Sequence, residues 1–233
     1  MWSCIIVAKG MWPVTERCLS TLLQTTDRRL ELIYVDNGTP VSESPKSWEE
    51  MSRWSTERVL PIKMALFEDA VPLARAWNVC LRMSTGSKIL ICNNDLVFHK
   101  VGWLEEFEKA LDDPAVGIVG VTGMSWQHTA FIQGSIFAIR REDVSPGGQF
   151  GFDERFLFTC EEVDFNLRLQ RDGKRIQVLE HLKGEYIEHL EGATRNYYKA
   201  DTTAYQRLAH ISRLEFCYKH LGTLGDDSIN IND

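Results

Sequence analysis

The sequence predicts an α/β protein with a mostly parallel central sheet and helices on both faces. Short apolar runs alternate with segments whose apolar residues recur at helical spacing, up to about residue 121. At 233 residues the chain is long enough to bury the core of one such domain. Because crossover helices must lie on the faces of a parallel sheet, this alternation favours a layered architecture.

Each element of the first half has a local basis. Apolar runs bounded by turn residues predict strands at 3–7, 30–38, 59–64, 89–92 and 116–121. Apolar residues three and four apart predict helices at 14–23, 44–55, 73–86 and 101–111. The second helix has Ser44 as its cap and Pro45 at its first position, where a missing N–H is tolerated.

After residue 122 the pattern is less regular. It predicts a strand within 134–143, a glycine-rich loop at 145–153, a helix from 161 to about 173, a strand after it, and a terminal amphipathic helix at 202–221. We expect one domain over 1–223, divided into halves at 1–121 and 122–200 and a terminal helix at 201–223. A polar tail occupies 224–233.

Composition excludes several classes of protein. The net charge is −7 without a basic tract, so no general nucleic-acid binding is expected. No apolar run approaches the roughly 18 residues of a membrane span, and the N-terminus lacks the features of a secretory signal. We expect a soluble, cytoplasmic protein.

The scattered cysteines predict buried thiols rather than disulfides or zinc ligands; they are Cys4, Cys18, Cys80, Cys92, Cys160 and Cys217.

Carboxylates follow two of the predicted strands. Asp36 comes after "LIYV", and Asp95 comes after "ILICNN". Either could be only a turn or cap residue, because Asp and Asn favour turns. In open α/β sheets, however, ligands bind beyond the carboxyl ends of the strands. Two such acids in one sheet therefore favour a binding site.

An ordinary dinucleotide site is excluded at the first turn. "VAKGMWPVTE" has one glycine and no GxGxxG pattern, and the chain has no Walker loop. A diphosphate bound here would need another source of positive charge. A divalent cation held by Asp95 is the natural candidate.

Six blocks in order along residues 3–195 resemble glycosyltransferase family 2, in its rhamnosyltransferase-like branch. They are "CIIVAKG", "LELIYVDNGT", "LARAWNVCLRMSTGSKILICNND", "GSIFAIRRED", "FLFTCEEVDFNLRLQRDGKRI" and "IEHLEGAT". The resemblance implies a GT-A fold, a nucleotide-sugar donor, a divalent metal and transfer with inversion. It makes 1–121 the nucleotide-binding half and 122–200 the acceptor-side half.

The resemblance also implies roles for residues at the donor site. Asn93-Asn94-Asp95 stands at the family's DxD motif, whose last acid binds the metal between the two phosphates. Asn93, being neutral, is left to hydrogen-bond the donor or orient a metal-bound water. Asp36 matches the acid that reads the nucleotide. The full set of expected donor contacts is Ala8, Lys9, Asp36, Asn37, Asn78, Asn93, Asn94, Asp95 and Arg195; for Asn78 a structural amide is the alternative.

The expected base begins the helix at "CEEVDFNLR". Inverting transfer is a single displacement, so one carboxylate must take the proton of the acceptor hydroxyl. The family's base is the second acid of a pair, here Glu162 after Glu161, with Glu in place of the commoner Asp. Either glutamate could face the acceptor, and acids also favour helix N-termini for structural reasons. Arg168 matches a family arginine with a structural role.

His189, in "YIEHLEGATR", fits a late family histidine that completes the metal site with Asp95; His181 is the competing candidate. A carboxylate with an imidazole suits Mn²⁺ better than Mg²⁺. Arg195 and Lys199 lie where a loop could close over the diphosphate. Trp126 and His128 belong to the acceptor side, where an aromatic ring either stacks on a sugar or packs in the core.

The sequence therefore predicts a metal-dependent inverting glycosyltransferase that moves a sugar from a UDP- or dTDP-sugar to an acceptor hydroxyl, in polysaccharide or glycan synthesis. Two alternatives stay open. One is a sugar nucleotidyltransferase, for which "AKGMWP" is a poor signature loop. The other is a non-catalytic sugar- or nucleotide-binding module on the same scaffold.

Overall fold

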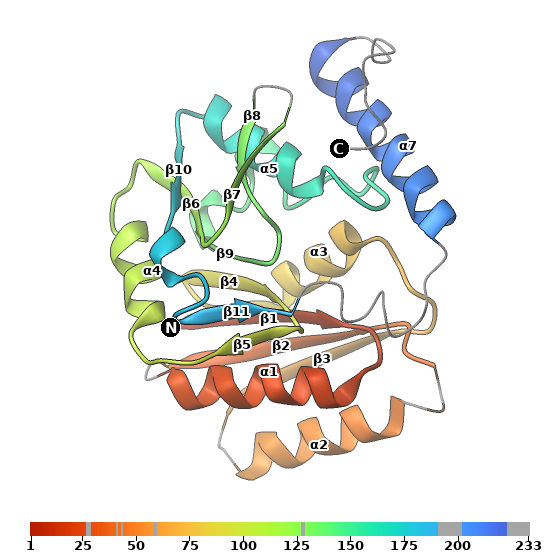
Figure 1. Ribbon diagram of the computed structural model, residues 1–233, viewed down its shortest axis with the longest axis vertical. Helices are drawn as coiled ribbons and strands as arrows, with labels where there is room; N and C mark the ends of the chain where they lie inside the picture. The colour runs from red at the N-terminus through yellow and green to blue at the C-terminus, as the bar shows by residue number, and fades with distance from the viewer. Residues whose placement is uncertain are drawn as a thin grey trace.

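The computed structural model describes residues 1–26, 29–40, 42, 44–57, 60–126, 129–190 and 202–222. Its centre is a seven-stranded sheet in the order β10-β6-β9-β4-β1-β2-β3 (Figure 1). The strands of this sheet are β1 (Trp2–Ala8), β2 (Leu30–Asn37), β3 (Ile62–Phe67), β4 (Lys88–Asn93), β6 (Val116–Gly120), β9 (Ile136–Arg140) and β10 (Arg175–Val178). β9 runs antiparallel to β4 and β6, and the other neighbours are parallel.

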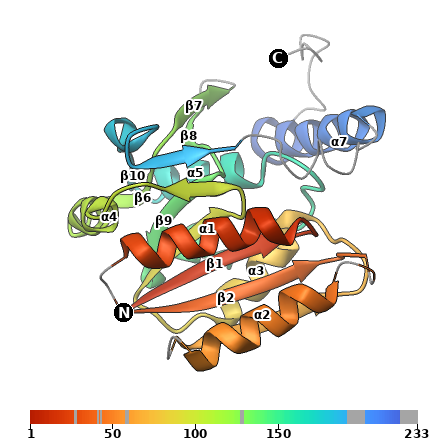
Figure 2. The same ribbon diagram turned by 60° about the horizontal axis from the view of Figure 1, so that its bottom comes forward.

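Helices cover both faces of the sheet, as the sequence predicted. They are α1 (Trp12–Thr25), α2 (Ser44–Glu57), α3 (Leu73–Met83), α4 (Trp103–Leu111), α5 (Glu161–Arg171) and α7 (Thr202–Leu221). Side chains from α1, α2 and α4 pack on one face with Cys4 and Ile6 of β1. Those of α3 and α5 pack on the other face with Ile5, since successive strand residues point to opposite sides. Figure 2 shows α1 and α2 together on the first face.

The helix α7 packs on side chains from the second half of the chain. Phe216 of α7 packs in a third apolar cluster with Phe131, Phe156 and Val163. Val163 belongs to α5, so the terminal helix is attached next to the start of that helix. The first turns of α7 line a pocket with Lys9 and Asn37, so they lie beyond the carboxyl ends of β1 and β2 (Figure 1).

Two short ribbons were not expected from the sequence. β5 (Leu96–Phe98) pairs antiparallel with β11 (Ile187–His189), and β7 (Gly123–Trp126) pairs with β8 (Thr129–Ile132). The third strand begins at Ile62 rather than 59, and the helix expected at 73–86 ends at Met83. Short 3₁₀ turns also occur, at Arg141–Asp143, Pro146–Gly148 and Glu180–Leu182.

The six cysteines are free and buried, which confirms the prediction of buried thiols. Within the described residues, no helix combines the length and hydropathy needed to cross a bilayer. The polar tail expected at 224–233 lies outside the described residues.

Candidate active site

The carboxyl ends of β1, β2 and β4 meet at one edge of the sheet. In the strand register Ala8 stands opposite Asp36, and Val7 stands opposite Asn93. This is the edge at which ligands bind in open α/β sheets. Asp36 and the Asn93–Asp95 segment, which are far apart in sequence, therefore lie on neighbouring strands.

Asp36 is fully buried and only half satisfied. Its Oδ1 accepts a hydrogen bond of 2.9 Å from the Thr39 backbone N–H, whereas Oδ2 has no partner among the described residues. A buried carboxylate oxygen without a partner is costly, because it has lost water without replacement. It is therefore suited to accept a hydrogen bond from a ligand.

The turn after β2 brings a second segment against this edge. Gly38 has φ +77°, and a Cβ there would lie 2.3 Å from the backbone nitrogen of Ala70, so only glycine permits the approach. Asn37 then fixes the segment: its amide donates to the Val71 carbonyl at 3.0 Å and accepts from the Val71 N–H at 2.9 Å. Asn37 thus shapes the edge with both ends of its amide in use.

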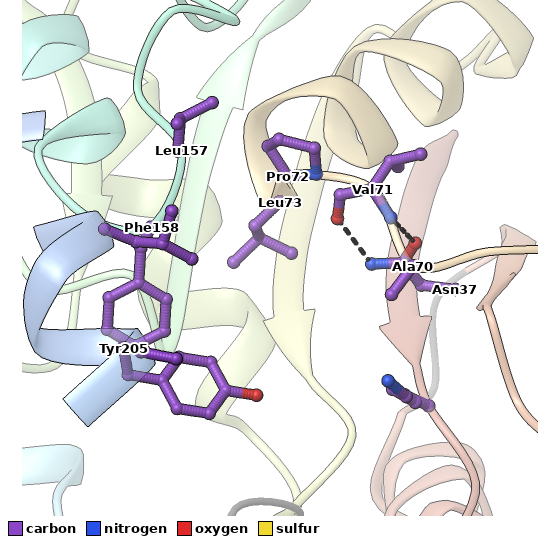
Figure 3. A pocket seen from close by; sticks show the side chains of 11 residues that line it. Asn37, Ala70, Val71, Pro72, Leu73, Leu157, Phe158 and Tyr205 are labelled. Carbon is purple, nitrogen blue, oxygen red and sulfur yellow. Dashed lines mark hydrogen bonds between the residues drawn. The ribbon is translucent and has the colours of Figure 1, made fainter. Parts of the chain in front are cut away.

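A pocket of about 690 Å³ opens beside the hydrogen-bonded pair Asn37 and Val71 (Figure 3). One wall is built from the first half of the chain, with Lys9, Asn37 and the segment 70–73. The opposite wall comes from the segment before α5 and from α7, with Leu157, Phe158 and Tyr205. The rings of Phe158 and Tyr205 are 4.7 Å apart and tilted by 45°. The pocket is therefore mostly apolar, with one aromatic wall.

Asp95 and His189 are brought together by the ribbon of β5 and β11. Leu96 pairs with His189 in that ribbon, and the Leu190 N–H donates to the Asp95 carbonyl at 2.9 Å. The Nε2 atom of His189 consequently lies 3.1 Å from Oδ1 of Asp95. The Asp95 side chain is 9% exposed and that of His189 is 20% exposed.

The two asparagines before Asp95 have different environments. Asn94 is buried and donates from Nδ2 to the Thr15 hydroxyl at 2.9 Å, which anchors the turn on α1. The Asn93 backbone N–H donates to the Ser135 carbonyl at 2.8 Å, while its side chain is half-buried. Asn94 therefore supports the turn, and Asn93 is the amide closer to solvent.

Glu161 and Glu162 begin α5 after Cys160, which has φ +73°. Glu161 is 4% exposed, and its Oε2 has no partner among the described groups. Burial, and then the charge of Glu162, raises the pKa of Glu161 well above its ordinary value. Burial also raises the pKa of Glu162, whose side chain is half-buried.

The loop at 133–135 connects Glu162 with the Asp95 region. A Cβ on Gly134 would lie 3.9 Å from the Glu162 carboxyl carbon and 3.3 Å from the Trp77 ring, so the carboxyl lies against this glycine. The next residue, Ser135, accepts the backbone hydrogen bond from Asn93. Gln133 and Ser135 also line one small cavity with His189. His189 and the Glu162 carboxyl thus lie beside this loop, and Asp95 is linked to it through its contact with His189.

Comparison of the sequence with known protein families shows which family the chain belongs to. The model of glycosyl transferase family 2 matches residues 3–155, which contain Asp36, Asn78 and Asp95. The chain belongs to this family. Glu161, Glu162 and His189 lie beyond the matched range. The match assigns no role to single residues, so the roles of all these residues stay predictions.

Relatives of the family are similar at low identity. The O-antigen biosynthesis protein RfbC of Myxococcus xanthus is 23% identical over 215 residues, covering 76% of this chain and 16% of that protein. A mannosyltransferase of Pyrobaculum calidifontis, solved with GDP-Man and Mn²⁺, has a TM-score of 0.72 at 19% identity, over 97% of this chain and 65% of that one. GalNAc-T7, solved with UDP, GalNAc and Mn²⁺, gives 0.68 at 12%, over all of this chain and 53% of that one. These similarities confirm the GT-A fold.

Asn78 occupies a different environment from the one expected for a donor contact of this family 2 domain. Its Nδ2 donates to the Phe152 carbonyl at 2.8 Å and to Glu154 at 2.9 Å, and its Oδ1 accepts from the Phe152 N–H at 2.8 Å. Both ends of the amide therefore hold the loop before α5. This favours the structural alternative for Asn78.

Of the remaining candidate site residues, two lie in the described part of the chain and three do not. His181, the rival metal ligand, is 60% exposed and lies 3.9 Å from Glu106. Trp126 packs against Phe216 with ring centroids 5.1 Å apart, which is the core alternative. Arg195, Lys199 and His128 lie outside the described residues.

Sequence reasoning on this family 2 chain missed Gly134, Phe158 and Tyr205. Gly134 stood inside a segment predicted as strand; a Cβ there would be tight against the Trp77 ring at 3.3 Å and in ordinary contact with the Glu162 carboxyl carbon at 3.9 Å. Phe158 and Tyr205 face the pocket only because α7 returns to the sheet edge. No local pattern carries that information.

Proposed function

We propose that this family 2 domain transfers a sugar from a nucleoside diphosphate sugar, UDP- or dTDP-linked, to an acceptor hydroxyl with inversion, in glycan synthesis. The observation that carries the proposal is the contact of His189 with Asp95; the Glu162 carboxyl supports it by lying against Gly134, one residue before Ser135, which lines a small cavity with His189. The similarity to an O-antigen biosynthesis protein of M. xanthus supports a role in glycan biosynthesis. The Mn²⁺ and nucleotide sugar in similar structures support the donor class.

The donor set of Asp95 and His189 fits a divalent cation. Two ligands in neighbouring octahedral positions, each about 2.1 Å from a metal, are roughly 3 Å apart. The Oδ1 and Nε2 atoms here are 3.1 Å apart. Across the described residues no cluster of three His, Cys, Asp or Glu could hold a metal, so the other ligands would come from the donor and water. Carboxylate with imidazole favours Mn²⁺ over Mg²⁺.

The nucleoside is expected in the pocket beside Asp36. Asn37, the residue after Asp36, lines this pocket, whereas the unpartnered Oδ2 of Asp36 is fully buried and would meet a ribose hydroxyl or a base N–H only after a local opening of the turn after β2. The aromatic wall of Phe158 and Tyr205 offers a surface on which a flat base can lie. Lys9, at the floor of the pocket, brings positive charge to the same side.

The reaction then requires a leaving diphosphate and a base. Bound at Asp95 and His189, the cation would neutralise charge on the departing nucleoside diphosphate. The oxygen of the acceptor hydroxyl attacks the anomeric carbon while Glu162 takes the hydroxyl proton. In the same step the glycosidic bond to the phosphate breaks, and the nucleoside diphosphate leaves. A carboxyl with a raised pKa is a stronger base than an ordinary glutamate, which suits it to this step.

The proposal is tested by incubating the protein with Mn²⁺ and a panel of nucleotide sugars and measuring release of nucleoside diphosphate. Wild type should release it slowly to water and faster with a hydroxyl acceptor. Glu162→Gln should bind donor with unchanged affinity and lose turnover by roughly 100-fold or more. Binding without any release by wild type would favour the non-catalytic module, and release of pyrophosphate from a nucleoside triphosphate with a sugar phosphate would favour the nucleotidyltransferase.

A further inference from the structure

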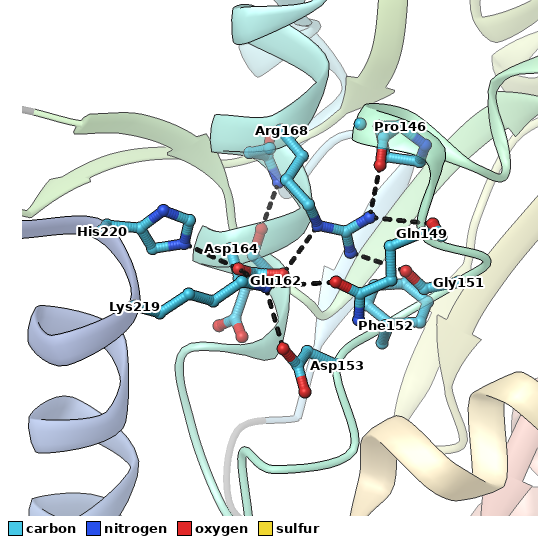
Figure 4. Close-up of polar contacts among 12 residues, drawn as sticks. Pro146, Gln149, Gly151, Phe152, Asp153, Glu162, Asp164, Arg168, Lys219 and His220 are labelled. Carbon is cyan, nitrogen blue, oxygen red and sulfur yellow. Dashed lines mark hydrogen bonds and ion pairs between the residues drawn. The ribbon is translucent and has the colours of Figure 1, made fainter.

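Asp164, in the first turn of α5, is the centre of a buried polar cluster (Figure 4). Its side chain is fully buried and accepts from three cations or donors: Arg168 Nε at 2.8 Å, Lys219 Nζ at 2.5 Å and His220 Nε2 at 2.7 Å. Arg168 is on the same helix, but Lys219 and His220 come from the end of α7. The terminal helix therefore supplies two of these three partners of an acid two residues after Glu162.

His220 spans two turns of α5. Its Nδ1 lies 2.8 Å from the Arg171 guanidinium, which can only donate, so Nδ1 is an acceptor. The ring proton is then on Nε2 and is donated to Asp164. His220 is neutral in this arrangement and is 2% exposed at its side chain. It fixes α7 along α5 from Asp164 to Arg171.

Lys219 and Arg168 connect α5 to the loop before it. Lys219 also bonds Asp153 at 2.9 Å and Gln149 at 3.3 Å. Arg168 donates to the carbonyls of Pro146, Gln149 and Gly151 at 2.6–3.0 Å. The same loop is held to α3 by Asn78, through Phe152.

The cluster also balances charge at the start of α5. Three acids, Glu161, Glu162 and Asp164, occupy the first turn. Burial alone raises the pKa of Asp164, but the hydrogen bond from His220 and the charges of Arg168 and Lys219 outweigh it and lower that pKa. Asp164 is therefore a paired anion, and its position is determined by both helices.

We propose that Lys219 and His220 of α7 are positioning residues that hold the first turn of α5, and with it Glu162, at the acceptor side of the site. The proposal rests on the proposed function, in which Glu162 is the base. It gives the terminal helix a role in turnover rather than in donor binding. A misplacement of about 1 Å in a reacting group can cost on the order of 100-fold in rate.

The test compares Lys219→Met and His220→Ala with matched variants that keep the interaction, Lys219→Arg and His220→Gln. The first two should lower kcat by 10–100-fold while KM for the donor and Mn²⁺-dependent UDP binding stay within about twofold. Lys219→Arg and His220→Gln should recover most of the loss, because each retains a donor to Asp164. Lys109→Met is the control, since Lys109 is 60% exposed and its ion pairs are with Glu105 and Glu106.

A second variant approaches the cluster from the loop before α5. Gly151 has φ +64°, and a Cβ there would lie 2.1 Å from Oδ1 of Asn78. Gly151→Ala should separate the loop from Asn78 and lower kcat in the same way, with donor KM preserved. Its thermal unfolding is measured alongside to establish that the variant is folded.

The outcomes separate the two proposals. If folded Lys219→Met and His220→Ala turn over at the wild-type rate, the positioning role is wrong and the proposed function stands. If they lose donor binding and kcat together, α7 acts on the whole fold and the positioning role is also wrong. If wild type itself transfers no sugar from any donor, the proposed function fails, and with it the role assigned to these residues.

Discussion

The imidazole Nε2 of His189 lies 3.1 Å from Oδ1 of Asp95, although 94 residues separate them in the chain. The contact depends on the pairing of two three-residue strands, β5 and β11. It joins the family's acidic motif to a histidine beyond the range that the family model matches.

Removing either member of this pair should weaken metal binding. We expect Asp95→Ala and His189→Ala each to lower Mn²⁺ affinity in the presence of UDP by roughly 100-fold, because even residues that only support metal ligands change affinity by 10–100-fold. Titration calorimetry, or the paramagnetic signal of free Mn²⁺, measures this. His181→Ala is the matched control, and an equal loss in that variant would contradict the assignment.

The fall of kcat at low pH should follow the protonation of Glu162. Burial raises the pKa of Glu162, and a base acts only when deprotonated. The kcat should therefore fall with decreasing pH at a value above the roughly 4.3 of an ordinary glutamate. A pH–rate profile at saturating donor and Mn²⁺ gives this midpoint. A midpoint at or below that of an ordinary glutamate would exclude Glu162 as the titrating base.

Glu161 should make stability depend on pH. Its raised pKa means that the folded state holds the proton more tightly than the unfolded state. Stability is therefore greatest below the unfolded pKa, about 4.3, and falls as the pH rises through the folded value. Glu161→Gln should stabilise the protein at pH 7.5 by about 1 kcal/mol and much less at pH 4, measured by denaturant unfolding.

The exposed Glu105 provides a control for this measurement. Glu105→Gln, at a side chain 51% exposed, should change stability little at either pH. The prediction is wrong if Glu161→Gln lowers the free energy of unfolding at pH 7.5 more than it does at pH 4. That result would show that the charged form of the buried carboxylate stabilises the fold.

Tyr205 should contribute to nucleotide affinity. Tyr205→Ala removes one ring of the aromatic wall and is expected to weaken UDP binding about tenfold, since stacking on a base contributes about 1–3 kcal/mol. Affinity for Mn²⁺ alone should not change. Tyr218→Ala, on the same helix and 58% exposed, is the control. Unchanged UDP affinity in Tyr205→Ala would remove the base from this wall.

The hydrophobic pattern was sufficient to predict the sheet and the edge at which Asp36 and Asp95 lie. Apolar runs determine which segments are buried strands, and polar residues at their ends then come to the same edge. Even so, the pattern did not predict β5 and β11, because three residues are too few for a periodic signal. The contact of His189 with Asp95 was expected only through the family resemblance.

Other features depend on packing between distant segments. Asn78 matched a family position expected at the donor, but its amide is bonded to Phe152 and Glu154, which no spacing in the sequence reveals. The network of Asp164 with Lys219 and His220 joins residues 55 and 56 positions apart. Long-range pairs of this kind have no local signature, so the role of α7 emerges only from the structure.

The ribbon of β5 and β11 also has a consequence for folding. Its two strands lie on either side of the segment 99–186, so the Asp95–His189 contact forms only when a loop of that length closes. Contacts between such distant segments are slow to form because a long loop must close first. Recovery of Mn²⁺ binding during refolding would therefore report when this long loop closes. The measurement follows a late folding event and needs no added label.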